Sequence, residues 1–87
     1  LARLEVRDAD PARAELEARQ MASRLLGWID TEDRRATTLI GPAPCYFSRQ
    51  AGLYRWQIIV RSPDPASLLR GRVPAHFRLE MDPQSLL

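Results

Sequence analysis

The chain has 87 residues and a mass of 9.9 kDa, which is enough for one small hydrophobic core. Hydrophobic residues make up 45% and charged residues 28%, as in folded globular domains, and no apolar run reaches the ~18 residues of a membrane span. Cys45 is the only cysteine, which excludes disulfide frameworks and cysteine-based zinc sites. The chain begins at Leu1 without a signal-peptide pattern, so we expect a single domain over residues 1–87, excised from a longer cytoplasmic protein.

The net charge of +2 is unevenly distributed, and every basic residue that contributes to it is arginine. Residues 1–33 hold five arginines against eight acidic residues, whereas residues 34–79 hold eight arginines against Asp64 alone. Residues 80–87 add two acidic residues. The middle of the chain therefore carries +7, and this asymmetry predicts an anionic partner. The alternative is a solvated surface on which arginine serves only solubility.

The first half of the chain predicts a strand, a helix and a second strand. Residues 2–8 alternate between apolar and polar side chains, which is the period of a half-buried strand. Asp10-Pro11 is a helix start, and apolar residues then recur at helical spacing until Gly27, where we expect the helix to end and the chain to fold back onto the core. Residues 36–41 are rich in β-formers and predict a strand that Gly41-Pro42 ends.

The second half predicts a long loop, a strand, a short helix and a last strand. Residues 42–52 make a loop too long for a tight hairpin, and residues 53–61 make the clearest strand, with Tyr54 and Trp56 on its core side. Asp64-Pro65 repeats the helix start, and Gly71 and Pro74 close that helix early. Residues 76–81 alternate again and predict a last strand. We expect one face of it, toward the core, to carry Phe77, Leu79 and Met81, and the opposite face to carry His76, Arg78 and Glu80.

This order of elements is that of an α+β, ferredoxin-like βαββαβ fold. Such a fold has a four-stranded antiparallel sheet, strand order 4-1-3-2, with both helices on one face. Several activities that the fold hosts need residues that are missing here. A metallochaperone needs two thiols, an acylphosphatase-type site needs an asparagine, and a phosphate-binding loop needs a lysine. We expect no enzymatic activity, catalytic residue, metal or cofactor in this chain, and a solvent-facing or structural role for His76.

The other face of this sheet would be open and basic. It would gather side chains from the first, third and fourth strands, opposed only by Glu5 and Glu80: Arg3, Arg7, Arg55, Arg61, His76 and Arg78. Guanidinium groups suit phosphate, and because the strand aromatics face the core, contact with a nucleic-acid backbone fits better than base reading. In the loop, Tyr46 and Phe47 beside Arg49 are the candidate aromatic contacts. The alternative is a face that stays solvated or packs on another domain.

The order of three motifs resembles the C-terminal domain of PriA, the primosomal protein N′. These are Gly41-Pro42-Ala43-Pro44, then residues 52–60 (Gly-Leu-Tyr-Arg-Trp-Gln-Ile-Ile-Val), then Met81-Asp82-Pro83. The Asp-x-Asp-Pro end of that family is Glu80-Met81-Asp82-Pro83 here, and the second helix is shorter than the family's.

The resemblance implies a ferredoxin-like DNA-binding module of a replication-restart helicase. Its partners would be forked or single-stranded DNA, the other domains of the parent helicase and, as a candidate, the single-stranded-DNA-binding protein, with no membrane. ATP and zinc are implied only for the upstream part of such a helicase. Arg49, Tyr54 and Arg55 match family positions. The alternative function is a protein-docking domain that packs on the helicase core or on a replication partner.

Overall fold

The computed structural model describes residues 1–50 and 52–82, with the backbone alone for 46–50. The elements follow the predicted order: β1 (Ala2–Asp8), α1 (Pro11–Thr31), β2 (Thr38–Gln50), β3 (Leu53–Arg61), α2 (Pro65–Leu69) and β4 (Arg78–Met81). The strands form one antiparallel sheet in the order β2-β3-β1-β4. The predicted α+β, ferredoxin-like architecture is therefore confirmed, together with its strand order.

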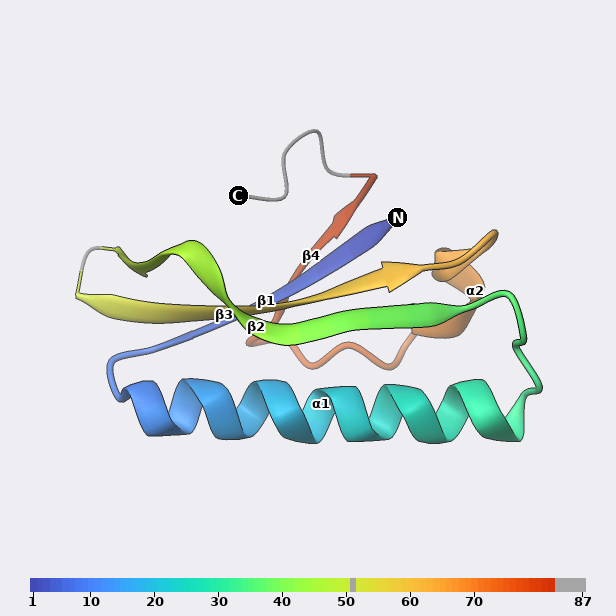
Figure 1. Cartoon of the computed structure of the whole chain (residues 1–87), viewed down its shortest axis with the longest axis horizontal. Coiled ribbons are helices and arrows are strands. Elements are labelled where there is room, and N and C mark those ends of the chain that lie inside the picture. The colour runs from blue at the N-terminus through green and yellow to red at the C-terminus, as the bar shows by residue number, and fades with distance from the viewer. Residues whose placement is uncertain (51, 83–87) are drawn as a thin grey trace.

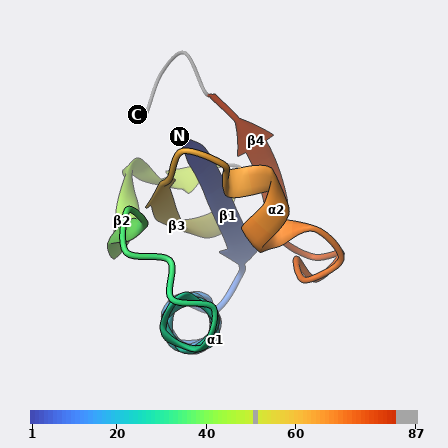
Figure 2. The same ribbon diagram turned by 90° about the vertical axis from the view of Figure 1, so that its right-hand side faces the viewer.

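The hydrophobic core lies between the sheet and its two helices, which cover the same face (Figures 1 and 2). Alternate residues of β1 and β3 supply the sheet side of this core, and α1, α2 and Phe77 close it. Its principal members are Leu4, Val6, Met21, Leu25, Ile58, Val60, Leu68 and Leu69. Of the helices described, none is both long enough and apolar enough to cross a membrane.

Both helices begin where the Asp-Pro pairs predict. The Asp10 carboxylate accepts a hydrogen bond from the Ala12 N–H at 2.9 Å, and the Asp64 carboxylate accepts one from the Ser67 N–H at 3.2 Å. In each case the proline occupies the first helical turn, where no N–H is needed. Helix α2 ends after five residues, as Gly71 and Pro74 predict.

Helix α1 is longer than predicted, because Gly27 does not end it. The helix continues to Thr31, and the Glu32 N–H closes it by donating to the Trp28 carbonyl at 2.9 Å. Trp28 and Ile29 stand three and four positions after Leu25, so they extend the same apolar stripe. Both pack against the core from within the helix. This burial outweighs the ~1 kcal/mol that a glycine costs inside a helix.

Strand β2 is also longer than predicted, and the expected loop over residues 42–52 is wrong. The strand runs to Gln50, which pairs with Leu53. It accommodates Pro42 and Pro44 because it is an edge strand, where a missing N–H costs little, and because its register with β3 shifts twice. The first shift lies between Ile40 and Ala43, and the second between Pro44 and Arg49.

Strand β4 is shorter than predicted, and only part of its expected core face is buried. Phe77 precedes the strand and is 8% exposed, but Leu79 and Met81 are 39% and 43% exposed. The cause is the combination of an edge strand and a short helix. Since α2 ends at Leu69, no described helix covers the outer side of β4.

Gly41 is the glycine on which the path of β2 depends, and its replacement tests that path. Its φ is +97°, and an added Cβ would lie 3.0 Å from both the Ala43 nitrogen and the Gln57 oxygen. We expect Gly41→Ala to lower the free energy of unfolding in urea by about 1–3 kcal/mol. Gly27→Ala is the matched control, since its Cβ would meet nothing within 4 Å in a helix, and we expect it to stabilise by about 0.5–1 kcal/mol. Equal midpoints for Gly41→Ala and the unmodified chain would contradict this account of β2.

Candidate nucleic-acid interface

The sheet face opposite the helices carries five of the predicted arginines. Residues paired across neighbouring strands share a face, and Arg3 pairs with Glu80 while Arg7 pairs with Arg55. We name this set the arginine face: Arg3 and Arg7 on β1, Arg55 and Arg61 on β3, and Arg78 on β4. The side chains of the other three predicted site residues, Tyr46, Phe47 and Arg49, lie outside the described part of the structure.

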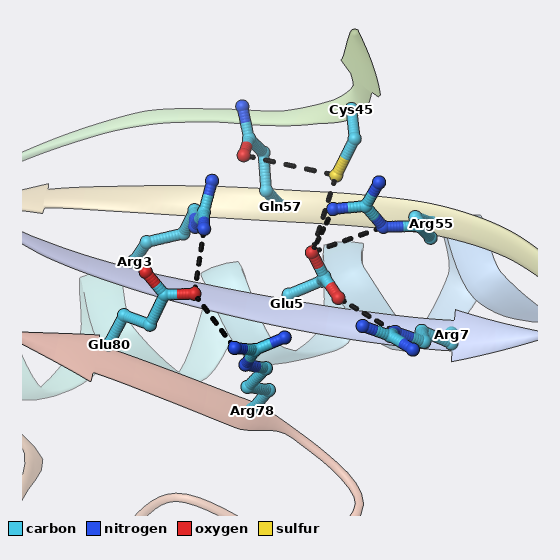
Figure 3. A network of polar contacts seen from close by, with 8 residues as sticks. All are labelled: Arg3, Glu5, Arg7, Cys45, Arg55, Gln57, Arg78 and Glu80. Carbon is cyan, nitrogen blue, oxygen red and sulfur yellow. Dashed lines mark hydrogen bonds and ion pairs between the residues drawn. The ribbon is translucent and has the colours of Figure 1, made fainter. Parts of the chain in front are cut away.

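The Glu5 carboxylate lies at the centre of this face and is hydrogen-bonded by two arginines (Figure 3). Arg55 donates to Oε1 from Nη2 at 2.6 Å and from Nε at 3.2 Å. Arg7 donates from Nε to Oε2 at 2.8 Å. Both carboxylate oxygens are thus occupied, and Glu5 is only 2% exposed. The sequence predicted Glu5 only as an opposing charge and missed this role, although its position between Arg3 and Arg7 was a signal.

Glu80 forms a second, more exposed centre on the neighbouring strand. Its Oε1 accepts from Arg3 Nη2 at 2.7 Å and lies 3.5 Å from Arg78 Nη2. The Arg3 side chain is 10% exposed and that of Arg78 is 62% exposed. Arg3 is therefore held along the sheet surface, whereas Arg78 extends into solvent.

Strand β2 covers Glu5 from above through its second register shift. Between Pro44 and Arg49 the strand advances five residues while β3 moves from Trp56 to Tyr54. This irregular stretch places the Cys45 thiol 3.9 Å from Glu5 Oε1 and 3.8 Å from Gln57 Oε1 (Figure 3). Cys45 is 3% exposed. The bulge therefore excludes water from one side of the carboxylate, which strengthens its interaction with the guanidinium groups.

The protonation of these groups follows from burial and pairing. Burial alone would raise the pKa of Glu5, but the hydrogen bonds from Arg55 and Arg7 outweigh it, so the pKa of this carboxyl lies below its ordinary value of 4.5. The bond to Glu5 in turn raises the pKa of Arg55. Burial raises the pKa of the Cys45 thiol, which keeps it neutral and poorly reactive at neutral pH.

The arginine face therefore contains two kinds of arginine. Arg3 and Arg55 are largely buried and hold the face together through the two glutamates. Arg7, Arg61 and Arg78 are exposed to solvent, with 42% of the Arg7 side chain accessible. Five arginines against two glutamates leave the face with three net positive charges, so its potential remains positive despite the ion pairs.

His76 does not belong to this face, contrary to the prediction. It precedes β4, and its Nε2 lies 3.3 Å from Glu17 Oε2 on α1, so it sits on the helix side of the sheet. The strand alternation that assigned it to the arginine face does not apply, because β4 begins only at Arg78. Among residues 1–50 and 52–82, no three or more His, Cys, Asp or Glu side chains gather in a group that could hold a metal ion.

Comparison with protein-family models and with curated proteins gives no match for this chain. The resemblance to the PriA C-terminal domain therefore rests on the three motifs and the order of elements, and it remains a prediction.

Removing the charge of Glu5 tests its structural role. In Glu5→Gln two guanidinium groups lose their counter-charge, one of them on a side chain that is 11% exposed, so we expect the free energy of unfolding to fall by about 3 kcal/mol. Glu15→Gln is the matched control, because Glu15 pairs with Arg19 on the exposed surface of α1, and we expect it to cost at most about 0.5 kcal/mol. Urea titrations measure both, and similar losses in the two variants would refute a special role for Glu5.

The lowered pKa of Glu5 also predicts how stability depends on pH. A carboxyl whose folded pKa is depressed stabilises the fold fully above its unfolded pKa, and this contribution is lost as the pH falls through the folded pKa. We expect the stability difference between the unmodified chain and Glu5→Gln to be large at about pH 7 and to shrink toward about pH 3. Urea midpoints measured across this range check it, and a difference that does not change with pH would speak against an ionised Glu5.

Proposed function

We propose that this domain is a non-enzymatic DNA-binding module of a PriA-type replication-restart helicase, which contacts the backbone of forked or single-stranded DNA through the arginine face. The observation that carries the proposal is the net positive charge of an open sheet face on which Glu5 and Glu80 hold four of the five guanidinium groups, those of Arg3, Arg7, Arg55 and Arg78. Fixed guanidinium groups lose little side-chain entropy on binding and can donate two hydrogen bonds to one phosphate.

Within this proposal the exposed arginines make the contacts and the buried ones support them. Arg61 ends β3 and is exposed, and it forms no ion pair with the residues that the structure describes, so its guanidinium group is available to a phosphate. Arg7 shares Glu5 with Arg55, and Arg78 shares Glu80 with Arg3. The side chains of Arg7 and Arg78 are nevertheless 42% and 62% exposed, so each remains accessible to a phosphate. Arg3 and Arg55 are largely buried and would support these side chains without touching DNA. The residues of the arginine face proposed to contact DNA are therefore Arg7, Arg61 and Arg78.

Contact with the DNA backbone accounts better for the face than reading of bases. Base-stacking proteins present aromatic rings on the binding surface. Here Trp56 is paired with Val6 on the helix side of the sheet, where it packs against the core and the Arg19 guanidinium lies 5.8 Å from its ring centroid. Tyr54 alternates onto the same side. Binding would then depend on shape and charge and weakly on sequence.

Salt-dependent DNA binding tests the proposal with the intact 87-residue chain. Titrations of fluorescent forked and single-stranded DNA at two salt concentrations should show affinity that falls steeply with salt. Arg61→Ala and Arg78→Ala should each weaken binding to all sequences alike and reduce the salt slope by about 1. Arg24→Ala, an exposed arginine on α1, is the matched control and should bind as the unmodified chain does. No binding at low salt, or an equal loss in Arg24→Ala, would refute binding through this face.

A protein-docking function is the second candidate, because an apolar groove lies uncovered in the part of the chain that the structure describes. A groove of about 330 Å³ lies between α2 and β4 and is lined mainly by Leu69, Val73, Leu79 and Met81. Under this hypothesis the arginine face would pack on the parent helicase, and the groove would bind a segment of a partner protein. A folded domain that binds no DNA at low salt would favour this candidate.

A further inference from the structure

The outer edge of β4 is open in the part of the chain that the structure describes, and its hydrogen-bonding groups can be assigned. Strand β4 is the last in the sheet, next to β1. The Asp82 N–H donates to the Leu1 carbonyl at 2.7 Å, so the backbone groups of Asp82 point toward β1. Glu80 and Arg78 lie two and four residues before Asp82, opposite Arg3 and Glu5, so their backbone groups point toward β1 as well. Because the groups of an antiparallel strand alternate in direction, those of Leu79 and Met81 point outward, away from β1.

The side chains at this edge are apolar as well. Leu79 and Met81 are 39% and 43% exposed, and they line the groove beside α2 together with Leu69 and Val73. A strand edge with outward N–H and C=O groups beside exposed apolar side chains is a template for another strand. The residues described contain no bulge or proline in β4 that would prevent such pairing.

We propose that the partner at this edge is a second copy of the chain, paired antiparallel through β4 about a two-fold axis at Leu79. The charges of β4 single out this register. An axis at Arg78 would place two arginines opposite each other, and an axis at Glu80 would place two glutamates there. Both arrangements oppose like charges, which destabilises a strand pair.

An axis at Leu79 instead places Arg78 opposite the partner's Glu80, and Glu80 opposite the partner's Arg78. These are the non-hydrogen-bonded positions, where facing side chains are closest, with Cβ atoms about 4.5–5.5 Å apart. The two Leu79 residues then form the central hydrogen-bonded pair. A register in which one copy of β4 slides by one residue relative to the other is excluded. It would place the outward-pointing backbone groups of one strand opposite the inward-pointing backbone groups of its partner.

The ladder in this register is short but regular. Leu79 exchanges two hydrogen bonds with the partner's Leu79, and each Met81 N–H donates to the carbonyl of the partner's Phe77. The Phe77 N–H is already used, since it donates to the Pro74 carbonyl at 3.0 Å, so it adds nothing to the pair. On the helix side the two apolar grooves adjoin, so the exposed side chains of Leu79 and Met81 from both copies cover one another. Four backbone hydrogen bonds and one small apolar patch predict a weak, concentration-dependent dimer.

Sedimentation of the intact chain at increasing concentration tests the proposal. The mean mass should rise from 9.9 kDa toward twice that value. Leu79→Lys places two ammonium groups together at the axis and should keep the chain monomeric at every concentration. Leu26→Lys is the matched control, since Leu26 is 56% exposed on α1, and it should dimerise as the unmodified chain does. A constant mass of 9.9 kDa for the unmodified chain, or dimers of Leu79→Lys, would overturn the proposal.

Disulfide trapping tests the register independently of affinity. In the proposed register the two Leu79 Cα atoms lie about 5.5 Å apart, within disulfide range, whereas the two Met81 Cα atoms are separated by more than about 7 Å. Leu79→Cys should therefore cross-link under mild oxidation at high concentration. Met81→Cys is the matched control, since it leaves the charges of Arg78 and Glu80 unchanged and Met81 is 43% exposed, and it should not cross-link. The native Cys45 is 3% exposed, so the unmodified chain is the baseline. Faster cross-linking of Met81→Cys than of Leu79→Cys would refute the axis at Leu79, whether or not the domain binds DNA.

Discussion

The Glu5 carboxylate, buried on the central strand β1 and bonded by Arg7 and Arg55, is the interaction on which the open face depends. A buried charge is costly unless its hydrogen-bonding capacity is met, and here two guanidinium groups meet it. The pairing links β1 to β3, so it also fixes two neighbouring strands in register. The bulge of β2 brings Cys45 over the carboxylate and lowers the local dielectric. The bulge in β2 therefore shields the same carboxylate that holds Arg7 and Arg55 in place.

This centre changes how the charge of the domain should be interpreted. Counting along the chain gives +7 over residues 34–79, but two glutamates from outside that segment, Glu5 and Glu80, neutralise part of it once the sheet forms. The arginines divide into supports and available donors according to how far the sheet buries them: the side chains of Arg3 and Arg55 are 10% and 11% exposed, and those of Arg7 and Arg78 are 42% and 62% exposed. A function that needs cations in fixed positions benefits from this division, because each support restricts the side chains beside it.

The sequence predicted the order of elements, both helix starts and the whole of β3, because each of these depends on local chemistry. An aspartate cap beside a proline, or a run rich in aromatic and β-branched residues from Leu53 to Arg61, is recognisable without tertiary contacts. The predicted ends of α1 and β2 were wrong, because there tertiary packing overrides the local sequence signal. Gly27 lies inside α1 because the partly buried Trp28 packs against the core, and Pro42 lies inside β2 because an edge strand tolerates it. The ion-pair centre could not be derived either, since alternation assigns a face but not the partner of each side chain.

The proposed β4 edge and the arginine face share Arg78, so their geometry is related. A two-fold axis at Leu79 would stand perpendicular to the sheet, so both arginine faces would lie on the same side of one eight-stranded sheet. The two β3 strands would then be separated by five strand spacings, about 24 Å. A stacked, B-like DNA strand advances ~3.4 Å per phosphate, so it would pass about seven phosphates between the two β3 strands. Two weak backbone contacts joined in this way bind more tightly than either alone, because the second contact is intramolecular. A dimer held by only four backbone hydrogen bonds would therefore be favoured by the polyanion itself, since DNA that contacts both faces adds its binding free energy to that of the pair.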